Sequence, residues 1–333
     1  MRQSFLALPI LFALLSATTT ARAELPAADA LLADVGFSAA EIADIKAGKI
    51  VNKSLAGAHE RDLASAFAFY VKVPPAELVK SLKAGLIGKI DPNEIARGTL
   101  SPAGAIADFA ALTLKPDAED RAKRYASAKG GSDLNLSADE IAAFNKLGSS
   151  AAVPDVEAQV RDALLARYQA YRAKGLDGIA SYDRGGGASR SVADDLRKSL
   201  DAVKNLKKYA PAAYTAMRDY PSAQPAGTED GFRWVHLKAH DVPTVVLVQG
   251  LFVPDGDGFL VLQRQFYVSE GFNCEQAVAG FLPAQGGTVV VYSNHTSTDQ
   301  VAGFGGGAKR SIGSKLMASQ LEGIFAKLQS SAK

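Results

Sequence analysis

The last hundred residues hold four segments rich in β-branched and aromatic residues, and one long amphipathic segment follows them. These segments predict strands at residues 232–238, 244–253, 259–268 and 288–293. Pro254-Asp-Gly-Asp-Gly258 predicts a hairpin turn between the second and third. Residues 298–327 predict a long helix, with an apolar stripe of Phe304, Ala308, Ile312, Leu316, Leu321, Ile324 and Leu328. Since strands and helices do not alternate here, we predict an antiparallel sheet that ends in a helix.

The rest of the chain predicts a lead-in, a strand-strand-helix opening and a helical middle. Two short helices are expected within residues 26–47, strands at 49–55 and 63–73, and a helix at 76–83 after Pro74-Pro75. Weaker strand signals lie at 96–100 and 111–114. Further helices are expected from 137 to 146, 155 to 174 and 192 to 208, with Arg184-Gly-Gly-Gly187 as a flexible connector and 209–228 as a loop.

The N-terminus has the features of a cleavable export signal. Arg2 precedes an apolar run from Phe5 to Leu15, and Ala21-Arg22-Ala23 is a small-residue cleavage site. We therefore predict a signal peptide at residues 1–23 and a periplasmic or secreted protein. The remainder divides into a helical lead-in at 24–48 and one domain at 49–330, with a helical insertion at about 137–220. No later stretch has the length and hydropathy of a transmembrane helix.

Charge and cysteine content narrow the classes of partner and chemistry. After residue 23 the chain has 35 basic and 35 acidic residues, so nothing in the charge balance indicates a nucleic-acid partner. Cys274 is the single cysteine, which excludes an intramolecular disulfide. Its predicted role is a buried small apolar side chain rather than a reactive thiol.

Motifs for cofactors and metals do not pass their spacing tests, so we predict no cofactor and no metal. Gly303-Phe-Gly-Gly-Gly307 lacks the βαβ context of a dinucleotide site, and Gly313-Ser-Lys315 is not a Walker sequence. The segment 133–140 lacks the glycine and final glutamate of a calcium loop. His236 and His240 lie in or beside a predicted strand, where their spacing is not that of zinc ligands on a helix. No nucleophile elbow or catalytic triad is recognisable.

Polar residues gather around the last predicted strands. They are Arg264, Gln265, Ser269, Asn294, His295 and Asp299. A few polar groups on a mostly apolar inner face would orient a ligand. The same residue types also serve as turn and cap residues at strand ends, so both interpretations remain open.

The order of elements resembles the START-like (SRPBCC, helix-grip) superfamily. The resemblance is carried by Phe69-Tyr-Val-Lys-Val-Pro-Pro-Ala-Glu-Leu78, Gln263-Arg-Gln-Phe-Tyr-Val268, Gly287-Thr-Val-Val-Val-Tyr-Ser293 and the segment 302–313. It covers about half of the chain after residue 23, and the chain is also similar to a group of uncharacterised secreted bacterial proteins. The resemblance implies an α+β fold in which a curved antiparallel sheet wraps around the long C-terminal helix and encloses a hydrophobic cavity.

The resemblance further implies that the cavity binds or transfers a hydrophobic small molecule or lipid. The ligand-binding candidates are Phe69, Trp234, Arg264, Phe266, Tyr267, Tyr292, Asn294, Ile312 and Leu316. Two alternatives stay open. The helical insertion would bind a partner protein if its helix at 155–174 exposed an apolar patch. A cavity enzyme would use Cys274 or His295, although no catalytic residue of the family can be transferred to this chain.

Overall fold

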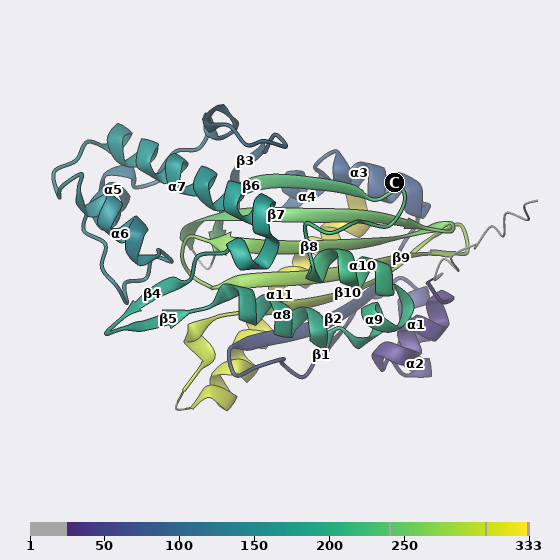
Figure 1. Cartoon of the computed structure of the whole chain (residues 1–333). Coiled ribbons are helices and arrows are strands. Elements are labelled where there is room, and N and C mark those ends of the chain that lie inside the picture. The colour runs from purple at the N-terminus through teal and green to yellow at the C-terminus, as the bar shows by residue number, and fades with distance from the viewer. Residues whose placement is uncertain (1–24, 240, 304, 332–333) are drawn as a thin grey trace, which may run out of the picture.

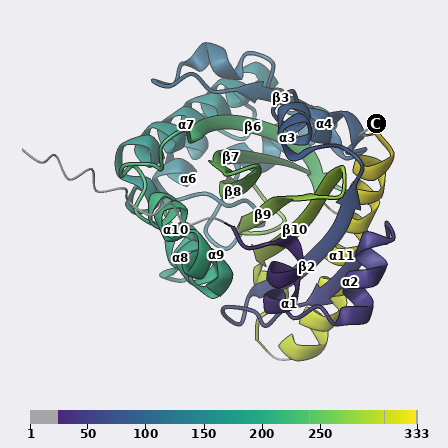
Figure 2. The same ribbon diagram turned by 90° about the vertical axis from the view of Figure 1, so that its right-hand side faces the viewer.

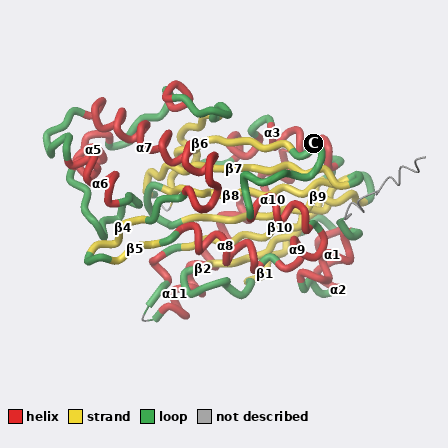
Figure 3. Tube along the Cα trace, in the orientation of Figure 1, coloured by secondary structure: helices red, strands yellow, loops and turns green. Residues whose placement is uncertain are grey.

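The fold is built on one large, curved antiparallel sheet (Figure 1). The computed structural model describes residues 25–331 except 240 and 304, so the predicted signal peptide and its cleavage site lie outside the described residues. The eight strands follow the order β1-β2-β10-β9-β8-β7-β6-β3, which leaves β1 and β3 at the edges. Figure 3 shows the strands from β6 to β1 as yellow segments that lie side by side. A separate two-stranded hairpin joins β4 (Tyr182–Gly185) to β5 (Ala188–Arg190). The α+β prediction with a large antiparallel sheet is confirmed.

The long hairpins at the end of the chain provide most of the sheet. Its strands are β1 (Val51–Ser54), β2 (Asp62–Val71), β3 (Glu94–Thr99), β6 (Glu229–Ala239), β7 (Val242–Asp255), β8 (Gly258–Val268), β9 (Cys274–Ala284) and β10 (Gly287–Ser297). Strand β9 was not predicted, because its alanines, glycine and proline have low strand propensity. Pairing with β8 on one side and β10 on the other holds it in place. The weak strand signal at 111–114 was wrong.

The helices differ in how they begin, and only some of those described start at a capping side chain. They are α1 (Ala28–Val35), α2 (Ala39–Lys46), α3 (Pro75–Lys83), α4 (Leu86–Ile90), α5 (Ala118–Ala126), α6 (Ala138–Asn145), α7 (Val153–Lys174), α8 (Val192–Ala202), α9 (Lys204–Tyr209), α10 (Pro211–Arg218) and α11 (Gly306–Ser331). The capping boxes of α2 and α6 are formed by Ser38 with Glu41 and by Ser137 with Glu140.

Three predictions for the middle of the chain were wrong. The helix expected at 192–208 is two helices, because the chain turns at Val203. The loop expected at 209–228 contains α10, since Pro211 occupies the first helical turn, where its missing N–H costs no hydrogen bond. The glycines at 185–187 all have positive φ and form the tight turn between β4 and β5 rather than a flexible connector.

Helices cover both faces of the sheet (Figure 2). On what we call the α11 face, α3 and α11 pack against Phe67, Phe69 and Phe281. On the opposite α7 face, the helices at the N-terminus pack on Ala66 and Val289, and those of the segment 153–218 pack on the strands from β6 to β9. Neighbouring strand residues alternate between the two faces. Both faces are therefore apolar, as in the almost wholly buried strand β2.

The apolar stripe predicted for the C-terminal helix is only partly correct. Phe325 and Leu328 are buried and Leu321 is half-buried against the sheet, whereas Ile312 and Leu316 are exposed. Ala308 is also exposed, and Phe304 lies outside the described residues. At about 100° per residue, the five-residue step from Leu316 to Leu321 turns the stripe by about 140°, so positions 308, 312 and 316 lie on the opposite side of the helix from Leu321 and Leu328.

Candidate functional site

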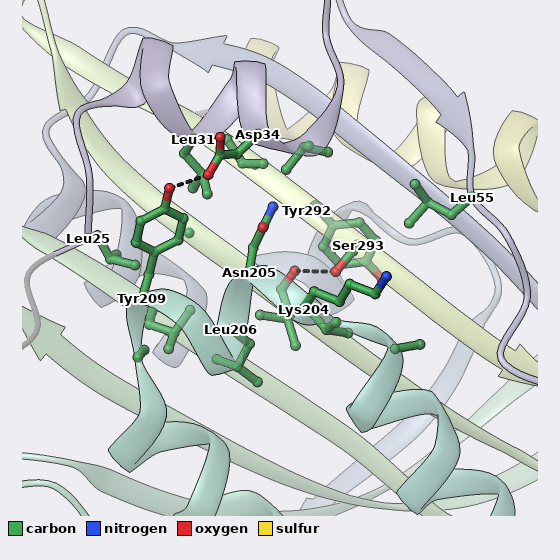
Figure 4. Close-up of a pocket in the computed structure, with 18 of the residues that line it drawn as sticks. Leu25, Leu31, Asp34, Leu55, Lys204, Asn205, Leu206, Tyr209, Tyr292 and Ser293 are labelled. Atoms are coloured by element: carbon green, nitrogen blue, oxygen red, sulfur yellow. Dashed lines mark hydrogen bonds between the residues drawn. The ribbon is translucent and has the colours of Figure 1, made fainter.

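A pocket of about 230 Å³ lies on the α7 face, between α1, α9 and the strands β8, β9 and β10 (Figure 4). Its apolar wall comes from three parts of the chain that are distant in sequence. Leu25 and Leu31 come from the N-terminus, Leu206 comes from α9, and strand residues such as Val278 and Val291 form the base. The predicted lead-in and the helical insertion thus meet at this pocket.

The residues that form the wall alternate along their strands. Leu260, Val278 and Val291 are directed to the α7 face from three neighbouring strands, and Gly280 leaves space beside Leu31. Lys204 and Asn205 also line the pocket, at the start of α9. The lining is therefore mostly aliphatic with a few polar groups, which is the usual composition of a small-molecule site.

Hydrogen bonds connect α1 to α9 across the pocket. The Tyr209 hydroxyl donates to a carboxylate oxygen of Asp34 (Figure 4). Lys208 Nζ forms an ion pair with the same oxygen at 2.5 Å. The hydrogen bonds from Lys208 and Tyr209 hold the pKa of the Asp34 carboxyl below its usual value. These contacts hold α1 and α9 next to each other over the sheet.

A buried polar interaction at the pocket involves His295. Its imidazole is almost completely buried, and Nδ1 lies 2.7 Å from Oδ2 of Asp62, which also accepts the Ala58 N–H at 2.6 Å. When Asp62 is ionised, Nδ1 carries the proton and donates to it. In the neutral ring Nε2 then bears the lone pair. The pair therefore fixes the orientation of a histidine that lines an apolar pocket.

Three further titratable groups, His59, Asp195 and Cys274, lie largely out of contact with solvent on the same side of the sheet. His59 Nε2 lies 3.8 Å from Oδ1 of Asp195, and the Ser297 hydroxyl donates to Oδ2 of Asp195 at 2.6 Å. Burial lowers the pKa of His59 and raises that of the Cys274 thiol. Among residues 25–331, with 240 and 304 excepted, no cluster of His, Cys, Asp and Glu has the arrangement of a metal site.

Three of the sequence-predicted site residues lie on the α11 face. The Phe69 ring stacks on Phe325, and the Tyr292 ring contacts Phe325 edge-on. Asn294 Nδ2 donates to the Tyr292 hydroxyl at 3.0 Å, and Thr296 donates to Asn294 Oδ1 at 2.8 Å. Tyr292 is also among the residues that line the pocket on the opposite face, and it is the only one of the nine predicted residues to do so.

A half-buried carboxyl group lies next to this cluster. Glu275 Oε1 accepts from Gln265 Nε2 at 3.0 Å, and Oε2 accepts from Thr296 at 3.4 Å. Burial raises the pKa of Glu275 despite these hydrogen bonds. Polar residues from β8, β9 and β10 thus form a short ladder across the α11 face.

Four predicted residues are packed into the core on the α7 face. Trp234 Nε1 donates to the Asp108 carbonyl at 2.8 Å, and Phe266 stacks on Tyr171 with ring centroids 4.1 Å apart. Arg264 donates to the Tyr171 hydroxyl at 3.0 Å, as well as to a main-chain carbonyl and to Gln276. Tyr267 lies under the guanidinium of Arg167. These side chains serve packing and hydrogen bonding within the fold.

Ile312 and Leu316 do not face the sheet. Their exposed fractions are 62% and 54%. The prediction that they line a cavity under the C-terminal helix is therefore not supported by their positions.

Comparison with known proteins gives no family for this chain. No protein-family model, curated protein or solved structure matches it. Within the described residues, every helix is too short or too polar to cross a membrane.

Sequence reasoning missed most of the pocket. His295 was noted as one of several polar residues, but its partner Asp62 lies more than two hundred positions earlier. Leu25, Leu31 and Leu206 give only an ordinary amphipathic signal. One signal in the sequence did indicate this site. The two short helices predicted before the first strand carry apolar side chains, which must pack against another part of the fold.

Proposed function

We propose that this protein binds a small, largely apolar molecule with one hydrogen-bonding end, in the pocket between α1, α9 and the sheet. The pocket itself carries the proposal, because a mostly aliphatic wall surrounds a few oriented polar groups. Its volume of about 230 Å³ is just below the range of about 300–1,000 Å³ typical of drug-sized ligands, which favours a small ligand.

The polar groups indicate how such a ligand would be oriented. Asp62 orients the imidazole of His295, and Ser293 lies two residues earlier on the same face of β10, so both belong to the strand side of the pocket. Lys204 and Asn205 contribute from α9. A carboxylic acid or alcohol with a short apolar chain matches this combination.

The proposal keeps the predicted ligand class and moves the site from the α11 face to the α7 face. A START-like, helix-grip relationship remains a proposal that the curved sheet and C-terminal helix support only in outline. The proposed location outside the cytoplasm depends on the export signal in residues 1–23.

The two alternative functions have less support. The large apolar side chains that are exposed among the described residues are Ile95, Ile106, Ile312 and Leu316, and none of them is on α7. The helix α7 therefore lacks the exposed apolar side chains that a partner-binding surface on the helical insertion would need. Cys274 is a poor nucleophile, because it is buried and its pKa is raised.

Native mass spectrometry tests the proposed pocket. We expect the chain from Glu24 onward, purified without detergent and then incubated with octanoate, to carry one bound small molecule. Val203→Trp places a large ring at the half-buried wall between α8 and α9, and should abolish that binding. Val153→Trp is the matched control, since Val153 is a half-buried valine at the start of α7 and outside the pocket.

Either of two outcomes contradicts the proposal. One is a wild-type chain that carries no molecule after purification and takes up no octanoate. The other is equal binding by wild type and Val203→Trp, which would place the bound molecule elsewhere.

A further inference from the structure

The N-terminal half of α11 carries positive charge without any negative charge. Lys309, Arg310 and Lys315 lie in its first ten residues, and the first acidic residue of the helix is Glu322. Lys309 and Lys315 are exposed, whereas Arg310 is half-buried and donates to the Glu60 carbonyl at 2.9 Å. Because basic and acidic residues are balanced over the chain after residue 23, this segment is a local excess of positive charge.

Two large apolar side chains are exposed on the same segment. Ile312 and Leu316 are four residues apart and therefore share one side of the helix. The buried side, with Phe325 and Leu328, holds the helix on the sheet, and Gly313 approaches Leu63. At about 100° per residue, Ile312 lies on the side of the helix opposite Phe325 and Leu328, and Lys309 and Lys315 flank the apolar pair on either side.

We infer that this outward side of α11, formed by Lys309, Ile312, Lys315 and Leu316, docks onto an anionic lipid surface. An apolar stripe flanked by lysines is the pattern of a helix that lies in the membrane interface. The lysines are attracted by lipid headgroups, and the two aliphatic side chains enter the boundary between headgroups and acyl chains.

The small size of the apolar surface favours a lipid surface over a protein partner. Two side chains provide far less area than the roughly 1,000 Å² expected for a specific protein interface. A bilayer needs no matching shape, and weak insertion combined with charge attraction gives reversible binding. The inference does not depend on the pocket, which lies on the opposite face of the sheet.

Vesicle co-sedimentation at low salt tests the inference, with the chain from Glu24 onward so that the apolar leader does not contribute. We expect binding to vesicles of phosphatidylglycerol and phosphatidylcholine in equal parts, and little binding to phosphatidylcholine alone. Lys309→Gln with Lys315→Gln should weaken binding about 25-fold, since each basic residue near an anionic surface contributes about fivefold. Ile312→Glu with Leu316→Glu should weaken it further.

The matched control is Ile95→Glu with Ile106→Glu, which changes the other two exposed isoleucines of the described residues and should leave vesicle binding unchanged. Circular dichroism checks that each variant is folded, and all four changed apolar positions are exposed. The inference is overturned if the wild-type chain does not bind anionic vesicles. It is also overturned if the variant with Ile312→Glu and Leu316→Glu binds them as tightly as the wild type does. Concentration-dependent self-association without vesicle binding would instead identify the segment as a contact between two copies, and would equally overturn it.

Discussion

His236 shows how a single buried residue couples this fold to pH. The side chain is buried on β6 close to Arg121, and its Nε2 has no hydrogen-bond partner among the described residues. Burial first, and the charge of Arg121 second, lower the pKa of His236 from 6.5 to about 4. Glu270 forms an ion pair with Arg121 at 3.0 Å and so keeps the charge of that arginine partly compensated.

We predict that His236 makes the protein less stable as the pH falls from 6.5 towards 4. Within this window the unfolded chain binds a proton that the folded chain does not, so the stabilising contribution is complete above about pH 6.5 and is lost below it. The loss is up to about 3 kcal/mol of unfolding free energy. Urea denaturation should show a smaller decrease between pH 7 and pH 4 for His236→Gln than for wild type.

The two proteins are compared by how their unfolding free energies change with pH, and not by the free energies themselves, because the substitution also changes packing. Between pH 7 and pH 8 the two proteins should respond alike to pH. Parallel curves over the whole acidic range would mean that His236 is protonated in the folded protein.

At the scale of elements, α11 has two halves that differ in how they contact the rest of the chain. Its C-terminal half is held by Phe325 between Phe67 and Phe69, with ring centroids 5.2 and 4.8 Å away. Its N-terminal half contacts the rest of the chain mainly at Gly313 and Arg310. Burial thus fixes one half, and the other half presents its outer side to the surroundings.

We expect Phe325→Ala to lower the unfolding free energy by about 3–5 kcal/mol, the usual cost of removing a buried aromatic ring. Ile312→Ala, on the same helix, should change it by no more than about 0.5 kcal/mol, because exposed side chains contribute little. Thermal or urea denaturation of both variants measures the difference. Similar losses in the two variants would show that Ile312 is buried in solution.

At the scale of the whole molecule, the open sheet brings the two ends of the chain together. Strand β2 pairs with β10 along its whole length, although more than two hundred residues separate them. The helices that cover the α7 face come largely from the segment between β3 and β6 (Figure 1). The central strands are therefore paired on both sides and covered on both faces.

We predict that amide hydrogens in β9 and β10 exchange most slowly, and that those of the edge strands β1 and β3 exchange early. Amides exchange through local opening, which is easiest where a strand has one neighbour and little cover. Hydrogen-exchange mass spectrometry resolves these segments. Exchange of β3 as slow as that of β9 would contradict the described strand order.

The sequence by itself determined the class of fold and most of the local structure. β-Branched and aromatic residues predicted the long strands near the C-terminus, and the capping residues Ser38 and Ser137 predicted helix starts, because these signals act over a few residues. The strand β9 escaped prediction, since its pairing partners rather than its own propensity hold it.

Only the tertiary structure decided which side chains meet. Asp62 and His295 are joined by the pairing of β2 with β10, and Leu31 and Leu206 by the packing of α1 and α9 on the sheet. A shift of one residue in register would direct every strand side chain to the other face. The position of the pocket on the α7 face, and the exposure of Ile312 and Leu316, therefore follow from long-range packing that local sequence patterns do not specify.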